Sequence, residues 1–564
     1  MVEDAVCFNH PAVRQYVRGS IKLQLEFGID GIFLDDSPIF CFCPICNAKF
    51  RTYLKNTYSP EELIRIFNVK DVSNVDPRNF MEERLLNTEN PLVAEWKRFR
   101  TLDYTENLQL LKAFGDSLKP GFILSDNACL WEGDPYRAFN YAVGPIEQWA
   151  KSMDFIFIEA QFDAYSHGGQ DLKVTNSPVL KYCAGASQGI PTVYLGYLGD
   201  PTSKIHNPLA GLTSLVKLCI AECNANQASY NYIPSWNGYS ENVHDQAEEK
   251  IIQGVSEYNS FLAKNEHLFL GSKPYANVAL FCSVEQAYAE YRTYAMAVSR
   301  MLLDEQIPHA MIVDDDVKPG ILEKYDLVIL PDVPMISDEK IDVFERYVKD
   351  GGGLLVMGTS SKCDEFGRLR KRLGLYRLLE EMEPWGHLDR SIDQTLGVNT
   401  ISKKLYGKGR VIFIPADAYG SLPMTGREQV VIFKDLAFVT ADKLISLNQV
   451  FGELVLWAAN GSYPVHCLAP YTVECHPLIQ TDKSRIIVHL VNYKVDLEGN
   501  IIEEKNTELK VLLPEGTKAK KVKLVSPDTI NEKVLEFNKV TENGKNFIEF
   551  VVPSISIYTL AVIK

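Results

Sequence analysis

The sequence predicts an α/β protein with three parts, and three observations lead to this prediction. Residues 1–272 alternate short apolar runs with longer helical stretches, which is the pattern of a parallel sheet covered by helices. Residues 273–445 repeat this alternation at a smaller scale. Residues 446–564 open with a helical pattern and continue with alternating runs separated by turns rich in Gly and Asn, which favours an antiparallel β-sandwich.

The first part contains five apolar runs that we interpret as strands. They lie at residues 30–34, 121–125, 154–158, 191–195 and 227–231. Helical patterns separate them, for example at residues 13–27, 91–118 and 209–225. About 270 residues of this texture suit a (β/α)₈ TIM barrel. We therefore expect such a barrel, although only five of its eight strands are evident.

The second and third parts have simpler patterns. In the second, runs at 278–282, 310–313, 327–330, 354–357 and 411–414 alternate with helices such as 284–304 and 338–348. This predicts a doubly wound, flavodoxin-like domain. In the third, a helix near 448–459 leads to alternating runs such as 485–490 and 546–552, which predict the sandwich.

Charge and composition limit the partners and the compartment. With 58 Lys and Arg against 73 Asp and Glu, the 564 residues carry a net charge of −15, which gives no electrostatic footprint for nucleic acid or an anionic membrane. No run approaches 18 apolar residues, so no membrane span is predicted. The first residues lack a basic and an apolar leader region. We expect a cytoplasmic protein whose twelve cysteines are reduced or bound to metal.

The densest chemical signal is Cys41-Phe-Cys43-Pro-Ile-Cys46. Three thiols within six residues can converge on one tetrahedral Zn²⁺, and Cys7 is the nearest candidate for the fourth ligand. Two alternatives stay open. Cys43 and Cys46 alone would fit a redox pair, which leaves Cys41 unexplained, and all four could be simple buried thiols. We expect structural zinc.

Acidic residues close two of the predicted strands of the first part. Asp35 and Asp36 follow the first run, and Glu159 follows the third. In a barrel, the chemistry lies at the carboxyl ends of the strands. Two carboxylates there are expensive to desolvate, and they could act as nucleophile and general acid of a retaining glycosidase. The alternative is that one of them caps a helix or binds an arginine. Further strand-end residues could bind a sugar by stacking or hydrogen bonds: Asp126, Asn127, Trp131, Tyr197, Asn231 and Trp236.

The cysteine motifs, together with the strand and carboxylates between them, resemble the β-galactosidases of glycoside hydrolase family 42. This resemblance implies a zinc ion held by Cys7, Cys41, Cys43 and Cys46. The second part, with its run Tyr325-Asp-Leu-Val-Ile-Leu-Pro331, is similar to the trimerisation domain of that family and implies a homotrimer. The third part resembles its C-terminal sandwich. The resemblance also places Cys7 after the third barrel strand, so we expect a barrel that lacks its first three βα units.

The catalytic pair of that family does not transfer to this chain. The family ends its fourth strand in Asn-Glu, where this chain has Asp35-Asp36, and the family's nucleophilic Glu has no counterpart in residues 191–198. The run from Asp30 to Asp35 instead resembles the fourth strand of α-amylase, α-galactosidase and α-fucosidase barrels, in which that Asp is the nucleophile. Glu159 takes the place that the acid/base has on the sixth strand in α-galactosidases and α-fucosidases.

We therefore expect a retaining glycoside hydrolase, β-galactosidase-like, that acts on a galactoside or related glycoside. Asp35 is the expected nucleophile, Asp36 its rival and Glu159 the general acid/base. The alternative is a non-catalytic carbohydrate-binding or assembly protein with a degenerate barrel, and the altered strand ends favour it.

Overall fold

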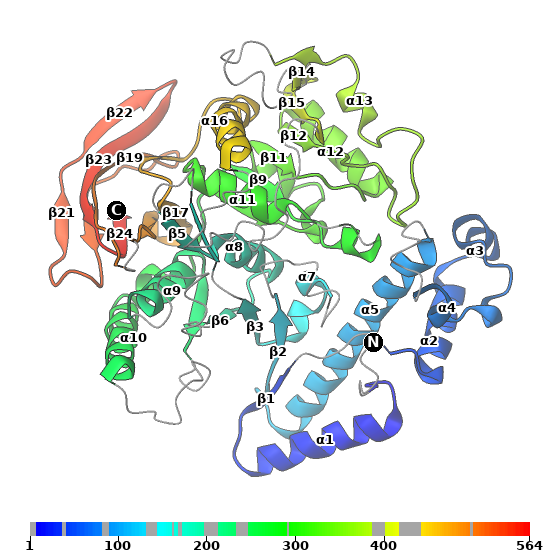
Figure 1. The fold of residues 1–564 in the computed structure, drawn as a ribbon. Helices are drawn as coiled ribbons and strands as arrows, with labels where there is room; N and C mark the ends of the chain where they lie inside the picture. Colours follow the sequence, from blue (N-terminus) through cyan, green and yellow to red (C-terminus); the bar gives the residue numbers. More distant parts are fainter. Residues whose placement is uncertain are drawn as a thin grey trace.

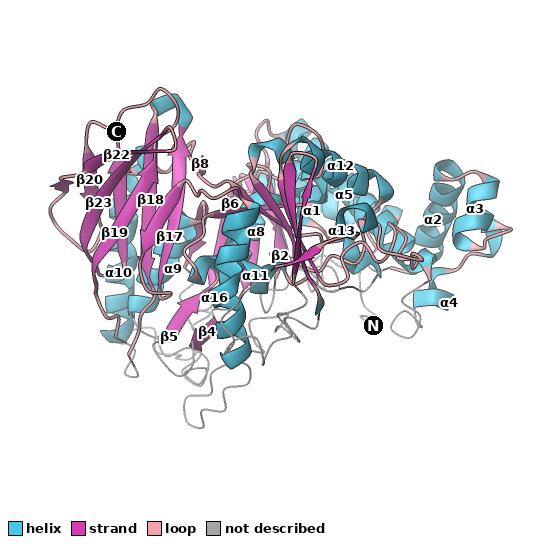
Figure 2. Cartoon of the chain, turned by 90° about the horizontal axis from the view of Figure 1, so that it is seen from above, coloured by secondary structure: helices cyan, strands magenta, loops and turns pink. Residues whose placement is uncertain are grey.

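The computed structural model describes residues 7–35, 41–81, 90–130, 144–160, 163–166, 172–196, 213–232, 246–289, 291, 293–385, 401–416, 441–496 and 500–564. Figure 1 shows a parallel sheet with its helices, a second sheet with its own helices, and a β-sandwich near the C-terminus. Seen from above in Figure 2, the sandwich lies at one end of the molecule. At the other end lie three helices, α2 (Pro44–Thr57), α3 (Pro60–Phe67) and α4 (Pro77–Met81).

The first sheet has five parallel strands in the order β1-β2-β3-β6-β7. These strands are the five that the sequence predicts, and their bounds are β1 (Gly31–Leu34), β2 (Ile123–Cys129), β3 (Phe155–Ala160), β6 (Thr192–Gly196) and β7 (Ala228–Asn231). The intervening elements are α1 (Pro11–Glu26), α5 (Pro91–Leu118), α7 (Ile146–Trp149), the hairpin β4 (Asp163–Ser166) and β5 (Leu172–Thr175), α8 (Ser177–Ala186), α9 (Thr213–Ala225) and α10 (Gln246–Lys264).

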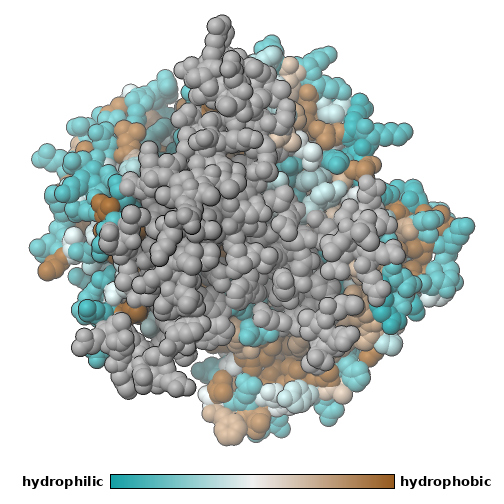
Figure 3. Space-filling model, viewed as in Figure 1, coloured by the Kyte–Doolittle hydropathy of each residue, from teal (hydrophilic) through white to brown (hydrophobic). Residues whose placement is uncertain are grey.

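Within the described residues this sheet is open. It ends at β1 on one side and at β7 on the other. Beside β1, the side chains of Ile29, Phe33 and Ile123 are 47%, 46% and 39% exposed, and Figure 3 shows apolar side chains along the lower rim of the visible face. The parallel sheet of the prediction is confirmed, whereas a TIM barrel that lacks its first three βα units stays a prediction.

The two faces of this sheet differ because successive side chains of a strand point to opposite sides. Leu124 of β2 and Ile156 and Ile158 of β3 are fully buried and pack in the same core as Tyr104 and Leu108 of α5. Ser125, Asn127, Phe157 and Glu159 therefore lie on the other face. The carboxyl ends of β2 and β3 carry polar residues on that second face.

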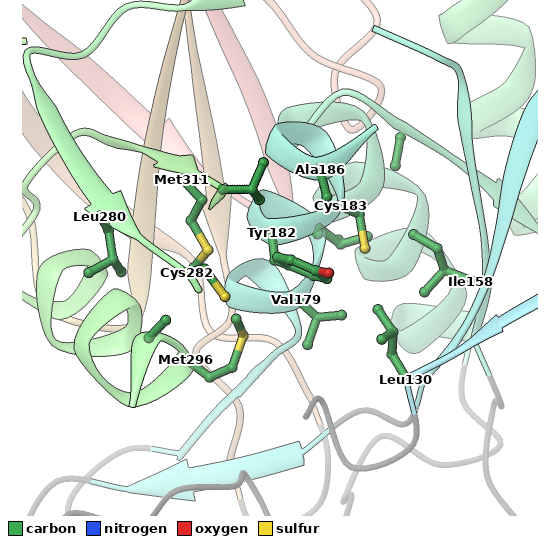
Figure 4. Packing of buried hydrophobic residues seen from close by; sticks show 14 of the residues in the cluster. Leu130, Ile158, Val179, Tyr182, Cys183, Ala186, Leu280, Cys282, Met296 and Met311 are labelled. Atoms are coloured by element: carbon green, nitrogen blue, oxygen red, sulfur yellow. The ribbon is translucent and has the colours of Figure 1, made fainter. Parts of the chain in front are cut away.

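Helix α8 joins the first sheet to the second. In Figure 4, Val179, Tyr182 and Cys183 of α8 lie between Ile158 of β3 and Met311 of the second sheet. The helix approaches the second sheet so closely at Gly185 that a Cβ atom there would lie 2.4 Å from the carbonyl oxygen of Met311. Glycine at this position is thus explained by packing between the two sheets.

The second sheet has the order β10-β9-β11-β12-β15-β14-β13. Its first five strands are parallel and follow the order 2-1-3-4-5 of flavodoxin-like folds, as predicted. Two antiparallel strands extend it. The elements are β9 (Val278–Phe281), α11 (Ala295–Asp304), β10 (His309–Ile312), β11 (Leu327–Leu330), α12 (Asp338–Asp350), β12 (Gly353–Met357), α13 (Tyr376–Leu379), β13 (Glu383–Pro384), β14 (Ser402–Tyr406), β15 (Gly409–Ile414) and α16 (Ala441–Ala458).

The C-terminal part consists of two antiparallel sheets, as predicted. One has the order β16-β19-β23-β22 and the other β21-β20-β24-β18-β17-β8. The short β8 (Lys273–Pro274) pairs with β17, so the residues that open the predicted second domain are part of the sandwich. The strands are β16 (Val465–Leu468), β17 (Val473–Gln480), β18 (Arg485–Asn492), β19 (Glu504–Leu512), β20 (Val522–Val525), β21 (Lys533–Leu535), β22 (Asn538–Glu542), β23 (Lys545–Ile555) and β24 (Tyr558–Ile563).

A buried ionic cluster ties all three parts together. Lys173 of β5 pairs with Asp304 of α11 at 2.9 Å and with Glu474 of β17 at 2.8 Å, and its side chain is fully buried. Glu474 also contacts His476 at 2.9 Å.

No helix in the described part of the chain is both long and apolar enough to cross a membrane.

Candidate active site and candidate metal centre

Asp35, Asn127 and Glu159 come together at the carboxyl ends of three neighbouring strands. Asp35 directly follows β1, Asn127 lies near the end of β2, and Glu159 lies near the end of β3. The Nδ2 atom of Asn127 donates to Asp35 Oδ1 at 3.0 Å and to Glu159 Oε2 at 2.8 Å. The two carboxylate oxygens are therefore at most 5.8 Å apart, the sum of these distances. The structure thus brings the two predicted catalytic carboxylates together.

This geometry suits chemistry that needs two carboxylates. Asn127 is 2% exposed and Glu159 6% exposed, so water screens the Glu159 carboxylate little, whereas the Asp35 side chain is exposed. The shared amide supplies a hydrogen-bond donor to each carboxylate. Beneath the pair, on the same face, the rings of Phe33 and Phe157 pack edge to face with their centroids 5.0 Å apart. The aromatic pair supports the strand ends that carry Asp35 and Glu159.

Asp126 points to the opposite face from its neighbour Asn127. Its carboxylate accepts a hydrogen bond from the hydroxyl of Tyr104 on α5, and it is fully buried there. Its Oδ1 atom also accepts from the backbone N–H of Asn127 at 2.8 Å. Although the sequence suggested Asp126 for substrate binding, its described contacts are with α5 and with the backbone of β2.

The other predicted sugar-binding residues are farther away or outside the described residues. Asn231 ends β7, and β6 separates that strand from β3. It is half-buried and its register partner is Leu195. Four predicted site residues lie outside the described residues: Asp36, Trp131, Tyr197 and Trp236.

The four predicted metal ligands form one cluster. The sulfur atoms of Cys7, Cys41, Cys43 and Cys46 lie within 4.8 Å of one another. Cys7 Sγ is 3.5 Å from both Cys43 Sγ and Cys46 Sγ. Four thiolates around a tetrahedral ion with metal–sulfur bonds of about 2.3 Å would have their sulfur atoms about 3.8 Å apart. The donor set and its spacing therefore fit a Cys₄ metal centre.

Local structure explains how the sequence builds this cluster. Cys43 caps the N-terminus of α2, Pro44 starts the helix, and Cys46 lies one turn further in. Hydrogen bonding with Cys46 and with Cys7 lowers the pKa of Cys41 to about 3, whereas the contact with Cys41 raises the pKa of Cys7. The cluster thus already favours a thiolate within it. Cys46 anchors the α2–α4 helices, since it packs in their core with Phe50 and Trp96.

Three residues around these sites have no signal in the sequence. Tyr104 contacts Asp126, and both Arg100 and Asn9 contact Cys46. These contacts exist only because α5 and the chain after Cys7 pack there. Arg100 and Tyr104 sit in the middle of a 28-residue helix whose sequence pattern predicts only a helix. Only the tertiary structure identifies them.

No protein-family model matches the chain, and a search of curated proteins found no match. Gan42B, a GH42 β-galactosidase from G. stearothermophilus, is 15% identical, with a TM-score of 0.66 over 99% of this chain and 82% of that chain. The β-galactosidase from Rahnella sp. R3 is 16% identical, with a TM-score of 0.64 over 99% and 82%.

A third solved structure carries a different activity in its name. The α-L-fucosidase isoenzyme 2 from Paenibacillus thiaminolyticus is 16% identical, with a TM-score of 0.61 over 99% of this chain and 81% of that chain. The chain therefore has a glycoside hydrolase fold. More narrowly, it has the fold of the GH42 β-galactosidases that the sequence resembles.

Proposed function

We propose that this protein is a retaining glycoside hydrolase that acts on a galactoside or a related glycoside. The observation that carries the proposal is the hydrogen bonding of Asp35 and Glu159 to one amide, which keeps the two carboxylate oxygens within 5.8 Å. In retaining enzymes the two carboxyl groups are about 5–5.5 Å apart, whereas inverting enzymes need about 6.5–9.5 Å. The β-galactosidase and fucosidase folds among the solved structures support the same class of substrate.

In this mechanism Asp35 is the nucleophile and Glu159 the general acid/base. A carboxylate oxygen of Asp35 attacks the anomeric carbon while Glu159 gives its proton to the leaving oxygen, and the glycosidic bond breaks through an oxocarbenium-like transition state. Water then attacks the glycosyl-enzyme, Glu159 takes the proton of that water, and Asp35 is released as a carboxylate. Asn127 Oδ1 is buried and has no hydrogen-bond partner among the described residues.

The assignment is tested with a panel of α- and β-nitrophenyl glycosides. We expect wild type to hydrolyse at least one of them with retention, and Asp35→Asn and Glu159→Gln to lose roughly 10³-fold or more of kcat. Azide should rescue Asp35→Gly by forming a glycosyl azide of inverted anomeric configuration, and Glu159→Ala by forming one of retained configuration. Rescue of Asp36→Gly in place of Asp35→Gly would make Asp36 the nucleophile.

If metal-loaded wild type hydrolyses none of the glycosides, the assignment as a glycoside hydrolase is refuted. Saturable binding of free sugars without hydrolysis would then favour the non-catalytic alternative. We propose four residues as sugar contacts, and their alanine variants should raise KM: Trp131, Tyr197, Asn231 and Trp236.

We also propose that the protein is a cytoplasmic homotrimer. Light scattering tests the oligomeric state, and cell fractionation tests the compartment.

For the metal centre we propose Zn²⁺ in a structural role. Four cysteines leave no open position on a tetrahedral ion, so the centre does not bind substrate. When bound, the ion would fix the N-terminus of α2 to the segment around Cys7. Metal analysis of purified wild type should find about one zinc per chain; a content near zero after reconstitution would refute the centre.

A further inference from the structure

The cysteine cluster has a charge that its surroundings must balance. Four thiolates around a divalent ion leave a net charge of −2, and Cys46 is fully buried. Burying uncompensated charge is strongly unfavourable unless hydrogen bonds or opposite charges meet it. The side chains that contact the sulfur atoms therefore matter for how firmly the ion is held.

Two nitrogen donors converge on the same sulfur atom, Cys46 Sγ. Arg100 Nη1 lies 3.4 Å from it and Asn9 Nδ2 lies 3.5 Å from it. Cys46 is the one fully buried member of the cluster, while Cys7, Cys41 and Cys43 are partly exposed and within reach of water. The guanidinium and the amide thus meet the ligand that water reaches least.

The position of Arg100 is fixed from three sides. Its Nη1 atom also donates to Asp103 Oδ2 at 2.6 Å, and its guanidinium lies over the ring of Trp96 at 5.7 Å from the centroid. Asn9 donates to the same Asp103 oxygen at 2.6 Å. Asp103 in turn pairs with Lys49 at 2.5 Å. Arg100 is only 6% exposed, so it has lost most of its rotamer freedom before any ion binds.

We propose that Arg100 is an outer-sphere positioning residue of the metal centre, which together with Asn9 offsets the thiolate charge at Cys46 and sets how tightly the ion is retained. This inference rests on the zinc centre proposed above. A hydrogen bond to a coordinated thiolate draws charge away from the sulfur and stabilises the bound state more than the free one. Asp103 and Trp96 hold the guanidinium in place for this contact.

The test measures Zn²⁺ affinity of the full chain by competition with a chromophoric chelator. Loss of an outer-sphere partner weakens metal binding by about 10–100-fold, and we expect this for Arg100→Gln. Arg100→Lys, which keeps the charge but loses the planar fork, should be intermediate. Arg65→Gln is the matched control, because Arg65 is exposed on α3 and touches no ligand. Unchanged affinity in Arg100→Gln would overturn the proposal.

Cobalt provides a readout that a purely structural role would not move. With Co²⁺ in place of zinc, the thiolate-to-metal absorption band should shift to longer wavelength in Arg100→Gln, because a sulfur that loses a hydrogen bond gives up charge more easily. If Arg100 serves only its ion pair with Asp103, the variant would lower the unfolding temperature of the loaded and metal-free forms equally. The band and the affinity would then stay as in wild type, which contradicts the proposal.

Two further outcomes are separable. If Arg100→Gln does not fold, the Zn²⁺ affinities of Arg100→Lys and Asn9→Leu are measured in its place. The first variant loses the guanidinium donor to Cys46 Sγ and the second loses the amide donor. If wild type itself binds no Zn²⁺, the metal centre fails. If wild type binds Zn²⁺ and all three variants bind it equally well, only the outer-sphere role of Arg100 and Asn9 fails.

Discussion

Asp35, which follows β1, and Glu159, near the end of β3, accept hydrogen bonds from one atom, Nδ2 of Asn127, at 3.0 and 2.8 Å. A single amide therefore sets the separation of the two carboxylates and donates to both. This arrangement makes Asn127 the central residue of the proposed site.

Replacing Asn127 by alanine should lower kcat roughly 100-fold, because the carboxylates lose the group that holds them in reacting geometry. Ser125→Ala is the control, since Ser125 lies on the same face of β2 and its hydroxyl has no hydrogen-bond partner among the described residues. Equal kcat in the two variants would contradict the assigned role.

Tyr104→Phe tests whether α5 supports the site through Asp126. The variant leaves a buried carboxylate without its hydroxyl donor, so we expect the free energy of unfolding to fall by about 1–3 kcal/mol. We also expect kcat to fall several-fold, since Asp126 holds the backbone of Asn127. Tyr53→Phe removes a comparable bond, from Tyr53 to Glu95 at 2.5 Å, away from the site, and should leave kcat unchanged.

Cys43→Ser should abolish zinc binding and lower the unfolding temperature, because the α2–α4 helices lose their link to the segment around Cys7. A chelator should lower the unfolding temperature of wild type and leave that of the variant unchanged. Cys467→Ser, in the core of the sandwich, should lower stability while the zinc content stays as in wild type. Metal analysis and thermal unfolding check both variants.

Lys173→Met tests the cluster between the three parts. The variant would leave Asp304 and Glu474 as buried carboxylates without their cation, which destabilises a protein by about 3–5 kcal/mol. Lys217→Met removes an exposed pair with Glu257 and should change stability by about 0–1 kcal/mol. Denaturant unfolding measures the free energy of unfolding of both variants. Similar losses in the two would show that the buried cluster stabilises the fold no more than an exposed ion pair does.

Glu222 makes stability depend on pH in the neutral range. Burial, and next the charge of Glu474, raise the pKa of Glu222 to about 7 from an ordinary value of 4.5. The folded chain therefore keeps this proton longer than the unfolded chain. The contribution of Glu222 is complete below about pH 4.5 and is lost as the pH rises to about 7, a change of about 3 kcal/mol.

Glu222→Gln should remove this dependence, because glutamine does not titrate. The unfolding free energy of the variant relative to wild type should rise by about 3 kcal/mol between pH 4.5 and 7. Taking the difference between the two proteins cancels the titration of buried groups such as His489, whose pKa burial lowers to about 3. A difference that is constant with pH would contradict the role of Glu222.

Much of the architecture could be predicted from the sequence. Apolar runs such as 154–158 and 327–330, separated by helical stretches, indicate parallel strands covered by helices, and the structure has strands there. The spacing of Cys41, Cys43 and Cys46 predicted a cluster, and the described sulfur atoms do converge. The limits of the domains stay a prediction; at the predicted start of the second domain, β8 pairs with a strand some 200 residues later in the chain.

The sequence by itself determined that carboxylates stand at the ends of apolar runs, as Asp35 and Glu159 do. The order of residues along the chain is a local property and can be read without the fold. It also predicted three members of the cysteine cluster, Cys41, Cys43 and Cys46, since they lie close together in the chain at the start of one helix. Only the tertiary structure decided that Asn127 bridges Asp35 and Glu159, that Asp126 turns to Tyr104, and that Arg100 meets Cys46. These contacts depend on strand register and on the rotation of α5 against the sheet, which are fixed by packing between segments far apart in the chain.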